Sequence, residues 1–498
     1  MTLRMADHTL ILDIGKSNAK LMLIDADGEV RARSSHANAS VDAAVEGIGY
    51  RALGVAALQQ WLLDAIPALP QRERIGRIGI STHGAAFCAI DDEGLVLPPI
   101  DYEWDGGATG YGDHRDAFAQ AIDPFAHTGA PLLPLGLNGG LPLFWLQRVA
   151  PASWARIRHW LPYPQYWAWW LSGVAASEVS SLGCHTQLWS PAQGTWSDWA
   201  QRSGIAARFA PLRGASDVLG VLRPALARQL GLRADCEVVC GVHDSNACLA
   251  RYLDQPAATL LTTGTWTVAM ATGSAPQTAL RPERDELINV SVTGQPVPTA
   301  RFMGGREFEV ICAGAPAALA TEAELAEVMA AGWHAQPGFA DAGGPFQGQV
   351  GQLLRHGVAQ AVMASDLPRR WRPALASLYC AQVSAGLVDA VRGVQARGAV
   401  ILEGPLAHNP AYGAALAALL GAQRPLWRSS DALEGTARGA WLLSRRPVPT
   451  PHAQALTASD TSPGAAVQLA RIAAPPAALA NAVRAHTAAG PLRRADVS

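Results

Sequence analysis

The stretch TLILDIGKSNAKLMLIDADGEV, residues 9–30, decides the fold. It consists of two apolar runs separated by a polar turn with one glycine, and it ends in the turn signal DADG. Short apolar runs bounded by such turns are typical of buried strands. The segment therefore predicts a β-hairpin with polar residues at its tip.

A second stretch, AATLLTTGTWTVAMATG at residues 257–273, repeats this plan about halfway along the chain. Two similar openings predict two similarly built domains with a boundary near residues 251–255. We expect an N-terminal domain at 1–252, a C-terminal domain at 253–445 and an Ala/Pro-rich tail with little periodicity at 446–498.

Strand-like and helix-like segments alternate between these landmarks, which predicts an α/β fold. We expect a helix within residues 40–69 and strands within 74–94. A Trp-rich region at 141–199 predicts helices whose tryptophans pack in the core. Further along, a long helix at 373–395 precedes a short strand at 399–404.

Composition limits the classes of function. A chain of 498 residues with 49% apolar and 16% charged residues supplies more than one core, and a ligand site then tends to lie between domains. The net charge of −2, with no block of Lys or Arg, argues against a nucleic-acid partner. The short N-terminal apolar run argues against export and membrane insertion, so we expect a cytoplasmic protein.

Cysteine and histidine spacing argues against structural cross-links. Seven scattered cysteines without a CxxC pair are typical of buried thiols in a reducing compartment. His83, His185 and His243 are far apart and lack the spacing of zinc ligands.

Three sets of residues could carry chemistry. At the first hairpin tip, glycine lets backbone N–H groups approach an anion, hydroxyl and ammonium groups can bind phosphate, and a carboxylate suits Mg²⁺. This set is Asp13, Gly15, Lys16 and Ser17. The second tip offers Thr263, Gly264 and Thr265. Either tip alone fits an ordinary hairpin, whereas two tips fit a nucleotide bound from both sides.

Asp244 is the third candidate. It follows the strand-like run EVVCGVH, where the pattern changes to that of a helix start. A carboxylate at the end of a strand could accept a proton from a hydroxyl group that attacks a phosphate. Capping of the helix by Asp244 or Ser245 explains the same pattern equally well.

In order and spacing, these segments resemble the FGGY carbohydrate kinases, relatives of actin, hexokinase and the heat-shock chaperones. The matching pieces, between about residues 10 and 443, are LDIGKSNAKLMLID, GISTHGAAFCAID, LSGVAASEVSSLGCHTQLWS, GVHDSNA, TTGTW, GGRE and LEGPLAHNP. The resemblance implies two ribonuclease-H-like α/β domains of the actin/hexokinase type with a cleft between them. It also implies a sugar and ATP as small-molecule partners, Mg²⁺, and a homodimer as one common state.

The resemblance also implies a role for each candidate. Asp244 becomes the general base, and Asp13 helps to hold Mg²⁺. The expected phosphate contacts are Gly15, Lys16, Ser17, Thr263, Gly264 and Thr265. Gly404 and Asn409 are expected near adenine or ribose. The expected sugar contacts are Thr82, His83, Trp104, Asp105 and His243. At the nucleotide turn, Pro405 follows Gly404 where the family usually has a run of glycines.

The closest branch in these motifs is that of the rhamnulokinases and fuculokinases, which phosphorylate O1 of 6-deoxyketohexoses such as L-rhamnulose and L-fuculose. Gly84 and Ala85 stand where glycerol kinases have an Arg-Glu pair, which argues against glycerol. Two alternatives stay open: a kinase for another sugar, such as xylulose, ribulose or a tetrose, and a sensing protein that binds sugar or nucleotide without transfer. A chaperone-like module would need a peptide-binding extension, which no segment resembles.

Overall fold

The computed structural model describes residues 7–107, 109–255, 257–273, 280–340, 344–445 and 467–492. Contacts divide the chain into two compact units. The first unit comprises Met1–Arg251, Ile288–Pro296 and Thr436–Ala466. The second unit comprises Tyr252–Leu287, Val297–Gly435 and Val467–Ser498.

The predicted first hairpin is confirmed, and it forms the middle of the first unit's main sheet. Strands β1 (His8–Ile14) and β2 (Asn18–Ile24) pair antiparallel, with Asp13 opposite Lys20. The sheet order is β12-β13-β6-β1-β2-β3, and β14 also pairs with β6. The other strands of this sheet are β3 (Val30–Ala37), β6 (Ile75–Thr82), β12 (Val218–Val221), β13 (Glu237–Val239) and β14 (Val242–His243).

Strand β1 is apolar from Leu10 to Leu12 and again at Ile14, because both faces of the strand are buried. Alternate side chains of a strand point to opposite faces of the sheet. Leu10, Leu12 and Ile14 belong to one core cluster, whereas Ile11 packs with Met22 in another. This arrangement explains the continuous apolar run in the sequence.

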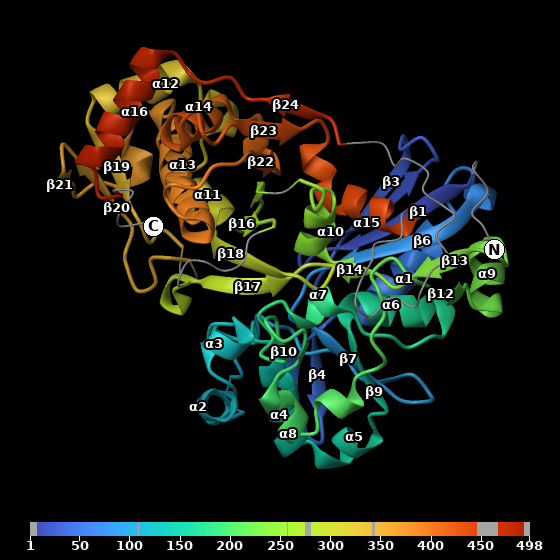
Figure 1. The fold of residues 1–498 in the computed structure, drawn as a ribbon. Coiled ribbons are helices and arrows are strands. Elements are labelled where there is room, and N and C mark those ends of the chain that lie inside the picture. The colour runs from blue at the N-terminus through green and yellow to red at the C-terminus, as the bar shows by residue number, and fades with distance from the viewer. Residues whose placement is uncertain are drawn as a thin grey trace. The chain divides into compact units, whose positions relative to one another are not determined.

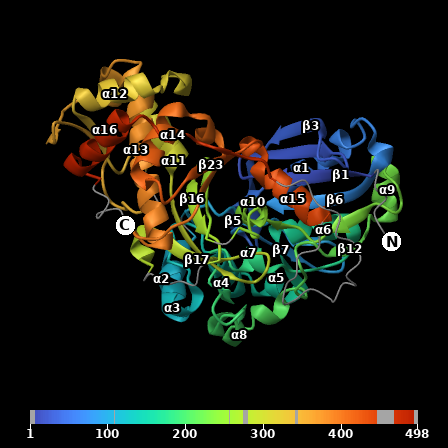
Figure 2. The ribbon, with the colours of Figure 1, turned by 45° about the horizontal axis from the view of Figure 1, so that its top comes forward.

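Helix α15 (Gly435–Arg445) covers the Ile11 face of this sheet through Ala440 and Trp441. Figures 1 and 2 show this late-chain helix lying along β1 and β6. The sequence predicts a C-terminal domain that runs to residue 445, but α15, at the end of this range, groups almost entirely with the first unit. The reason is that the apolar side chains of α15 pack on the first unit's sheet.

The helix expected within residues 40–69 is only partly correct. Residues Val55–Ala65 form helix α1, but β4 (Ser40–Val45) and β5 (Ile48–Leu53) form an antiparallel hairpin. The two residues between these strands, Glu46 and Gly47, both have positive φ, the geometry of a tight two-residue hairpin turn. Ile48 and Ala52 continue the helical spacing of Val55, Leu58 and Leu62, although Ile48, Tyr50 and Ala52 also alternate as in a strand.

The Trp-rich region packs as predicted. Trp145, Trp160, Trp189 and Trp199 are buried in one core cluster, and Trp167 is buried in the neighbouring one. The small strands of this unit are β7 (Phe87–Ile90), β8 (Leu95–Leu97), β9 (His159–Pro162), β10 (Trp189–Ser190) and β11 (Thr195–Trp196). Its further helices are α2 (Tyr111–Ala121), α3 (Phe125–Thr128), α4 (Gly140–Val149), α5 (Pro151–Arg156), α6 (Tyr163–Ser172), α7 (Val179–Leu182), α8 (Asp198–Arg202), α9 (Pro224–Leu230) and α10 (Asp244–Ala250).

The second unit repeats the strand order of the first, as the repeated hairpin predicts. Its sheet order is β17-β18-β16-β15-β22-β23-β24. Within it, β18-β16-β15-β22-β23 has the same sequence of antiparallel and parallel pairings as β3-β2-β1-β6-β13. The strands are β15 (Thr259–Thr263), β16 (Thr267–Ala271), β17 (Glu286–Val290), β18 (Pro296–Phe302), β22 (Val400–Glu403), β23 (Leu426–Ser429) and β24 (Leu469–Arg471).

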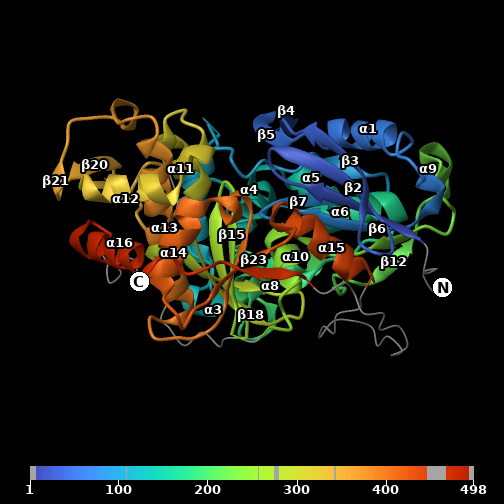
Figure 3. The same cartoon turned by 90° about the horizontal axis from the view of Figure 1, so that it is seen from above.

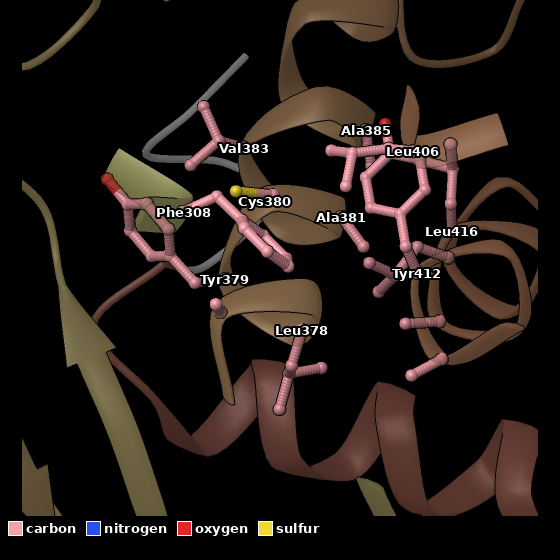
Figure 4. Close-up of a cluster of buried hydrophobic side chains, with 14 of the residues drawn as sticks. Phe308, Leu378, Tyr379, Cys380, Ala381, Val383, Ala385, Leu406, Tyr412 and Leu416 are labelled. Atoms are coloured by element: carbon pink, nitrogen blue, oxygen red, sulfur yellow. The ribbon is translucent and has the colours of Figure 1, made fainter. Parts of the chain in front are cut away.

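The long predicted helix is confirmed as α13 (Trp371–Arg392), the centre of the second unit's core. Figure 4 shows Tyr379 and Cys380 of this helix near Phe308, with Tyr412 on a neighbouring helix. Among the described residues, α13 is the one helix long and apolar enough to cross a membrane, and its most apolar stretch is entirely buried inside the unit.

Part of the predicted tail is built into the second unit. Strand β24 extends the sheet beside β23, and α16 (Ala477–Ala489) packs on α12 and α14, as Figure 3 shows. Residues 446–466 and 493–498 of the tail lie outside the described residues. The remaining elements of this unit are α11 (Gly304–Cys312), α12 (Glu322–Ala330), α14 (Pro410–Leu420), β19 (Trp333–Gln336), β20 (Gln352–Arg355) and β21 (Val358–Ala359).

The close approach of α15 to α10 gives a first prediction. A Cβ at Gly439 would overlap the backbone carbonyl of Ala247, so Gly439→Ala must separate the two helices. We expect a loss of about 1–3 kcal/mol in the free energy of unfolding, measured by urea denaturation. Gly112→Ala is the matched control, because Gly112 lies in helix α2 with open space around it, and we expect a neutral or slightly stabilising effect. Equal effects of the two substitutions would contradict this packing.

Candidate functional site

Three neighbouring parallel strands of the first unit end at the same edge of the sheet. Strand β6 lies between β1 and β14, with Ser81 opposite both Asp13 and Val242. His243 lies opposite Thr82, and Asp244 follows directly. The topology therefore brings Asp13, Thr82, His83, His243 and Asp244 together at the carboxyl ends of strands, where α/β sheets bind ligands.

Asp13 and Asp244 repel each other at this edge. Burial and the negative charge of Asp244 raise the pKa of Asp13 to about 7, and Lys20 partly opposes them. Two carboxylates held in this way favour either a shared proton or a cation.

The carboxylate of Asp244 is fixed through one oxygen. Its Oδ1 accepts the backbone N–H of Ser245 at 2.5 Å and the Ser245 hydroxyl at 3.2 Å. His243 Nε2 lies 3.3 Å from the same oxygen. Helix α10 begins at Asp244 with His243 in the N-cap position, so neither Asp244 nor Ser245 is the N-cap residue.

His243 is the centre of a buried polar cluster. Its Nε2 also lies 3.4 Å from Cys184 Sγ. Burial alone lowers the pKa of His243, but the charges of Cys184, Asp244 and Glu178 outweigh burial and raise it to about 9. Burial likewise raises the pKa of Cys184, but His185 and His243 lower it to about 5. Neither Cys184 nor Glu178 is a candidate from the sequence, because both come from segments about 60 residues away.

His83 lies between two tyrosines. Its ring centroid is 5.3 Å from that of Tyr102 and 5.0 Å from that of Tyr163. Burial lowers the pKa of His83, and its Nδ1 lies 2.9 Å from the carbonyl oxygen of Gly84, so Nδ1 donates and Nε2 is left as an acceptor. The buried Thr82 hydroxyl donates to the carbonyl oxygen of His83, and it therefore orders the local backbone.

Trp104 and Asp105 lie in other surroundings. Trp104 packs in an aromatic cluster with Tyr50, Tyr111 and Trp145. Asp105 is exposed and accepts the backbone N–H of Gly107. Among the described contacts, Tyr102 and not Trp104 meets His83.

Lys16 is directed at carboxylates. Its ammonium lies 2.6 Å from Asp101 and 3.4 Å from Glu103, and it sits 5.4 Å from the centre of the Tyr102 ring. Lys16 and His83 also line a cavity of about 90 Å³. The remaining polar groups of its wall include His36, Asn38, Ser40 and Tyr163.

The first hairpin tip is braced by a neighbouring strand end. Gly15 N–H donates to the Asn18 carbonyl oxygen at 2.9 Å, and the Asn38 side chain donates to the Gly15 carbonyl oxygen at 2.7 Å. The backbone N–H of Asn38 donates to Ser17 O at 2.9 Å. Ser17 itself is exposed.

In the second unit, the second tip packs against the predicted nucleotide turn. The buried Thr263 hydroxyl donates to Glu403 O at 2.7 Å and accepts Leu406 N–H at 3.1 Å. Gly404 has a φ of 89°, and a Cβ there would overlap Thr263 O. Gly264 and Thr265 are exposed at the tip.

Asn409 caps helix α14. Its side chain accepts the N–H of Tyr412 at 3.0 Å and donates to the Ser377 hydroxyl at 3.0 Å. Pro405 opens a short 3₁₀ helix, Pro405–His408, at the first position, where a missing N–H costs no helical hydrogen bond. The departure at Pro405 is therefore accommodated by the local backbone.

The buried charge of Asp13 predicts a pH-dependent stability effect. Because its pKa in the folded chain lies above the value of 3.8 in an unfolded chain, the ionised carboxylate destabilises the fold increasingly between pH 4 and pH 7. We expect Asp13→Asn to raise the Tm, measured in a metal chelator, by at least about 2 °C at pH 8 and much less near pH 4.

Asp116→Asn, at an exposed position, serves as the control and should leave the Tm unchanged at both pH values. If Asp13→Asn does not raise the Tm at pH 8, the destabilising effect of the ionised Asp13 is contradicted.

Comparisons with known proteins agree with this fold. The description "FGGY family of carbohydrate kinases, N-terminal domain" matches residues 8–250, and "Carbohydrate kinase FGGY, C-terminal domain" matches residues 255–454. A solved carbohydrate kinase from Novosphingobium aromaticivorans is 33% identical, with 97% of this chain and 98% of that chain covered and a TM-score of 0.78. Xylulose kinase from Lactobacillus acidophilus, 14% identical with a TM-score of 0.74 over 96% of each chain, shows the fold alone.

Among curated proteins, the L-fuculokinases of Salmonella typhi and Escherichia coli K12 are 27% and 25% identical. These matches cover 55% and 54% of this chain and 58% of each relative, so the chain matches just over half of the relatives' length. The two family descriptions together cover nearly all of the chain. The chain belongs to the FGGY family of carbohydrate kinases and has their two-domain α/β fold.

Proposed function

We propose that this protein transfers the γ-phosphate of ATP to a primary hydroxyl of a ketose, with Asp244 as the general base. The observation that carries this proposal is that Asp244 and Asp13 lie at the ends of two strands, β14 and β1, that both pair with β6. Phosphoryl transfer needs positioning, a base and charge neutralisation, and these two carboxylates can supply the base and a cation site.

The geometry of Asp244 supports its role as the base. All three of its described hydrogen-bonding contacts go to Oδ1. Oδ2 is then the oxygen that can accept the proton of a substrate hydroxyl. A fixed carboxylate loses little orientational freedom when the sugar binds, and this benefits the rate.

The residues present fit a magnesium ion held through Asp13. Among the described residues, no cluster of three or more His, Cys, Asp or Glu could hold a metal alone. Mg²⁺ in kinases is commonly held by one or two carboxylates together with substrate phosphates. The repulsion between Asp13 and Asp244 favours such a cation. When bound, Mg²⁺ would neutralise charge on the phosphates.

We assign the nucleotide to the second tip and its turn. The exposed Gly264 and Thr265 can approach phosphate, whereas Thr263 ties the tip to the turn at Gly404. Asn409 orders the helix that follows the turn. In the first unit, Gly15 and Ser17 remain phosphate candidates, and Lys16 is better matched to its carboxylates and to the sugar side.

For the acceptor we favour a 6-deoxyketohexose such as L-rhamnulose or L-fuculose. The L-fuculokinase relatives support this class, and the packing at Gly84 argues against glycerol. A Cβ at Gly84 would lie 2.8 Å from His243 Nε2, so the arginine of glycerol kinases would displace His243. A kinase for another sugar, such as xylulose, ribulose or a tetrose, is the alternative, and we expect cytoplasmic activity in either case.

Coupled ADP release across a panel of ketoses and polyols tests the reaction. We expect one 6-deoxyketohexose to support turnover, and Asp244→Asn to lower kcat by a factor on the order of 10²–10⁴ without weakening ATP binding. Asp198→Asn, at an exposed position, should be active. A folded protein that binds ATP but is silent on the whole panel would support the sensing alternative instead.

The nucleotide turn gives a separate prediction. Gly404→Ala places a methyl group against Thr263 O, and we expect the KM for ATP to rise about tenfold or more, since the turn must shift. Gly421→Ala is the matched control, because Gly421 has a similar backbone conformation (φ 75°, ψ −180°, compared with 89° and −174°) and open space. It should cost stability but leave the KM for ATP unchanged. An unchanged KM for ATP in Gly404→Ala would contradict the assignment of this turn to the nucleotide site.

A further inference from the structure

The proposed mechanism leaves one buried pair unused, the thiol of Cys184 and the imidazole of His243. Cys184 follows α7 by two residues and is 3% exposed, and His243 is 5% exposed. Sγ and Nε2 lie 3.4 Å apart, within hydrogen-bonding reach for sulfur. All seven cysteines are buried, but Cys184 has two histidines beside it.

The surroundings of His243 can accept a proton from each ring nitrogen. Nδ1 lies 3.4 Å from the side-chain nitrogen of Asn246, and the Asn246 Oδ1 is buried without a hydrogen-bond partner among the described residues. The two ends of an amide are assigned only by their hydrogen bonds, so the opposite orientation is equally valid. Turned by 180°, Asn246 Oδ1 accepts a proton from Nδ1, and Nε2–H is left to donate towards Cys184 and Asp244.

The same nitrogen connects the pair to the base. Nε2 is 3.3 Å from Asp244 Oδ1, so it lies between the sulfur and the carboxylate. A buried imidazolium is unfavourable by itself, because burial lowers the pKa of His243. An adjacent thiolate offsets this effect, and a cationic Nε2–H then binds Oδ1 more strongly than a neutral one would.

Other titratable groups face this pair from the packed segments. Ser180 accepts the backbone N–H of His243 at 3.3 Å and donates to Glu178 at 2.5 Å. His185 lies beside Cys184, and the charges of Asp244 and His243 act on His83. The charge of Asp244 also acts on Asp13. Glu178 also favours a cationic His243, so the cluster has a consistent charge pattern.

We propose that Cys184 is a positioning residue that gives its thiol proton to His243, so that the resulting imidazolium holds Oδ1 of Asp244 and leaves Oδ2 for the substrate hydroxyl. The sulfur becomes a thiolate, Nε2 gains the proton, and no other bond changes. This inference rests on the proposed function through the role of Asp244 as base.

Cys184→Ser tests the ionised sulfur, because serine keeps a polar group of similar size that does not ionise. We expect kcat to fall about ten- to a hundredfold in both Cys184→Ser and Cys184→Ala, with the KM for ATP changed less than about twofold. The acid limb of the kcat profile should move in Cys184→Ser, as it should in His243→Gln, because both variants lose the thiolate–imidazolium pair beside the proposed base.

Cys88→Ala is the matched control, since Cys88 is a fully buried thiol of the same unit whose pKa is raised by burial. It should lower stability without moving the acid limb. Full recovery of kcat and of the pH profile by Cys184→Ser, or a wild-type rate in Cys184→Ala, would overturn the proposal.

Ultraviolet absorbance of the thiolate gives a readout that needs no substrate. We expect one ionised thiol in the wild type at neutral pH, lost in Cys184→Ser and in His243→Gln and kept in Asp244→Asn. An un-ionised wild type overturns the inference whatever the activity. If no sugar is phosphorylated, the proposed function fails, and the thiolate absorbance still decides whether the pair exists.

Discussion

The repulsion between Asp13 and Asp244 is the interaction on which the first unit's site depends. Two carboxylates cannot be held close together unless the backbone that carries them is rigid, because each would otherwise turn towards water. Here Asp13 lies near the end of β1 and Asp244 follows β14, and β6 between these two strands fixes their register. The apolar cores on both faces supply the rigidity that holds this charge pair.

The polar groups around these carboxylates act mainly on orientation. Ser245 and His243 bind one oxygen of Asp244, and Asn38 braces the first hairpin tip. In the second unit, Thr263 connects the hairpin tip to the turn at Gly404 through two hydrogen bonds. A site ordered before substrate arrives needs less reorganisation during phosphoryl transfer.

Apolar runs, turn residues and helical spacing in the sequence predicted the elements that depend on neighbouring residues. Both hairpins, α13 and the strand ends carrying Asp13 and Asp244 follow from apolar runs and polar breaks. The β4–β5 hairpin differs from the predicted helix because Glu46-Gly47 is a weak turn signal and because Ile48 and Ala52 of β5 continue the helical spacing of α1. The partners of the site residues could not be predicted, since Lys16 meets Asp101 from 85 residues away and His243 meets Cys184 from 59 residues away.

The position of α15 has a consequence for biosynthesis. A ribosome releases the two middle strands of the first sheet early, but the helix that covers one face of them is made roughly 400 residues later. Until then Ile11, Met22 and Ile24 face no partner from α15, and an N-terminal fragment ending near residue 250 would carry the same bare apolar surface. Such surfaces favour aggregation or chaperone binding. The first unit begins at the N-terminus, yet its folding can finish only after nearly the whole chain exists.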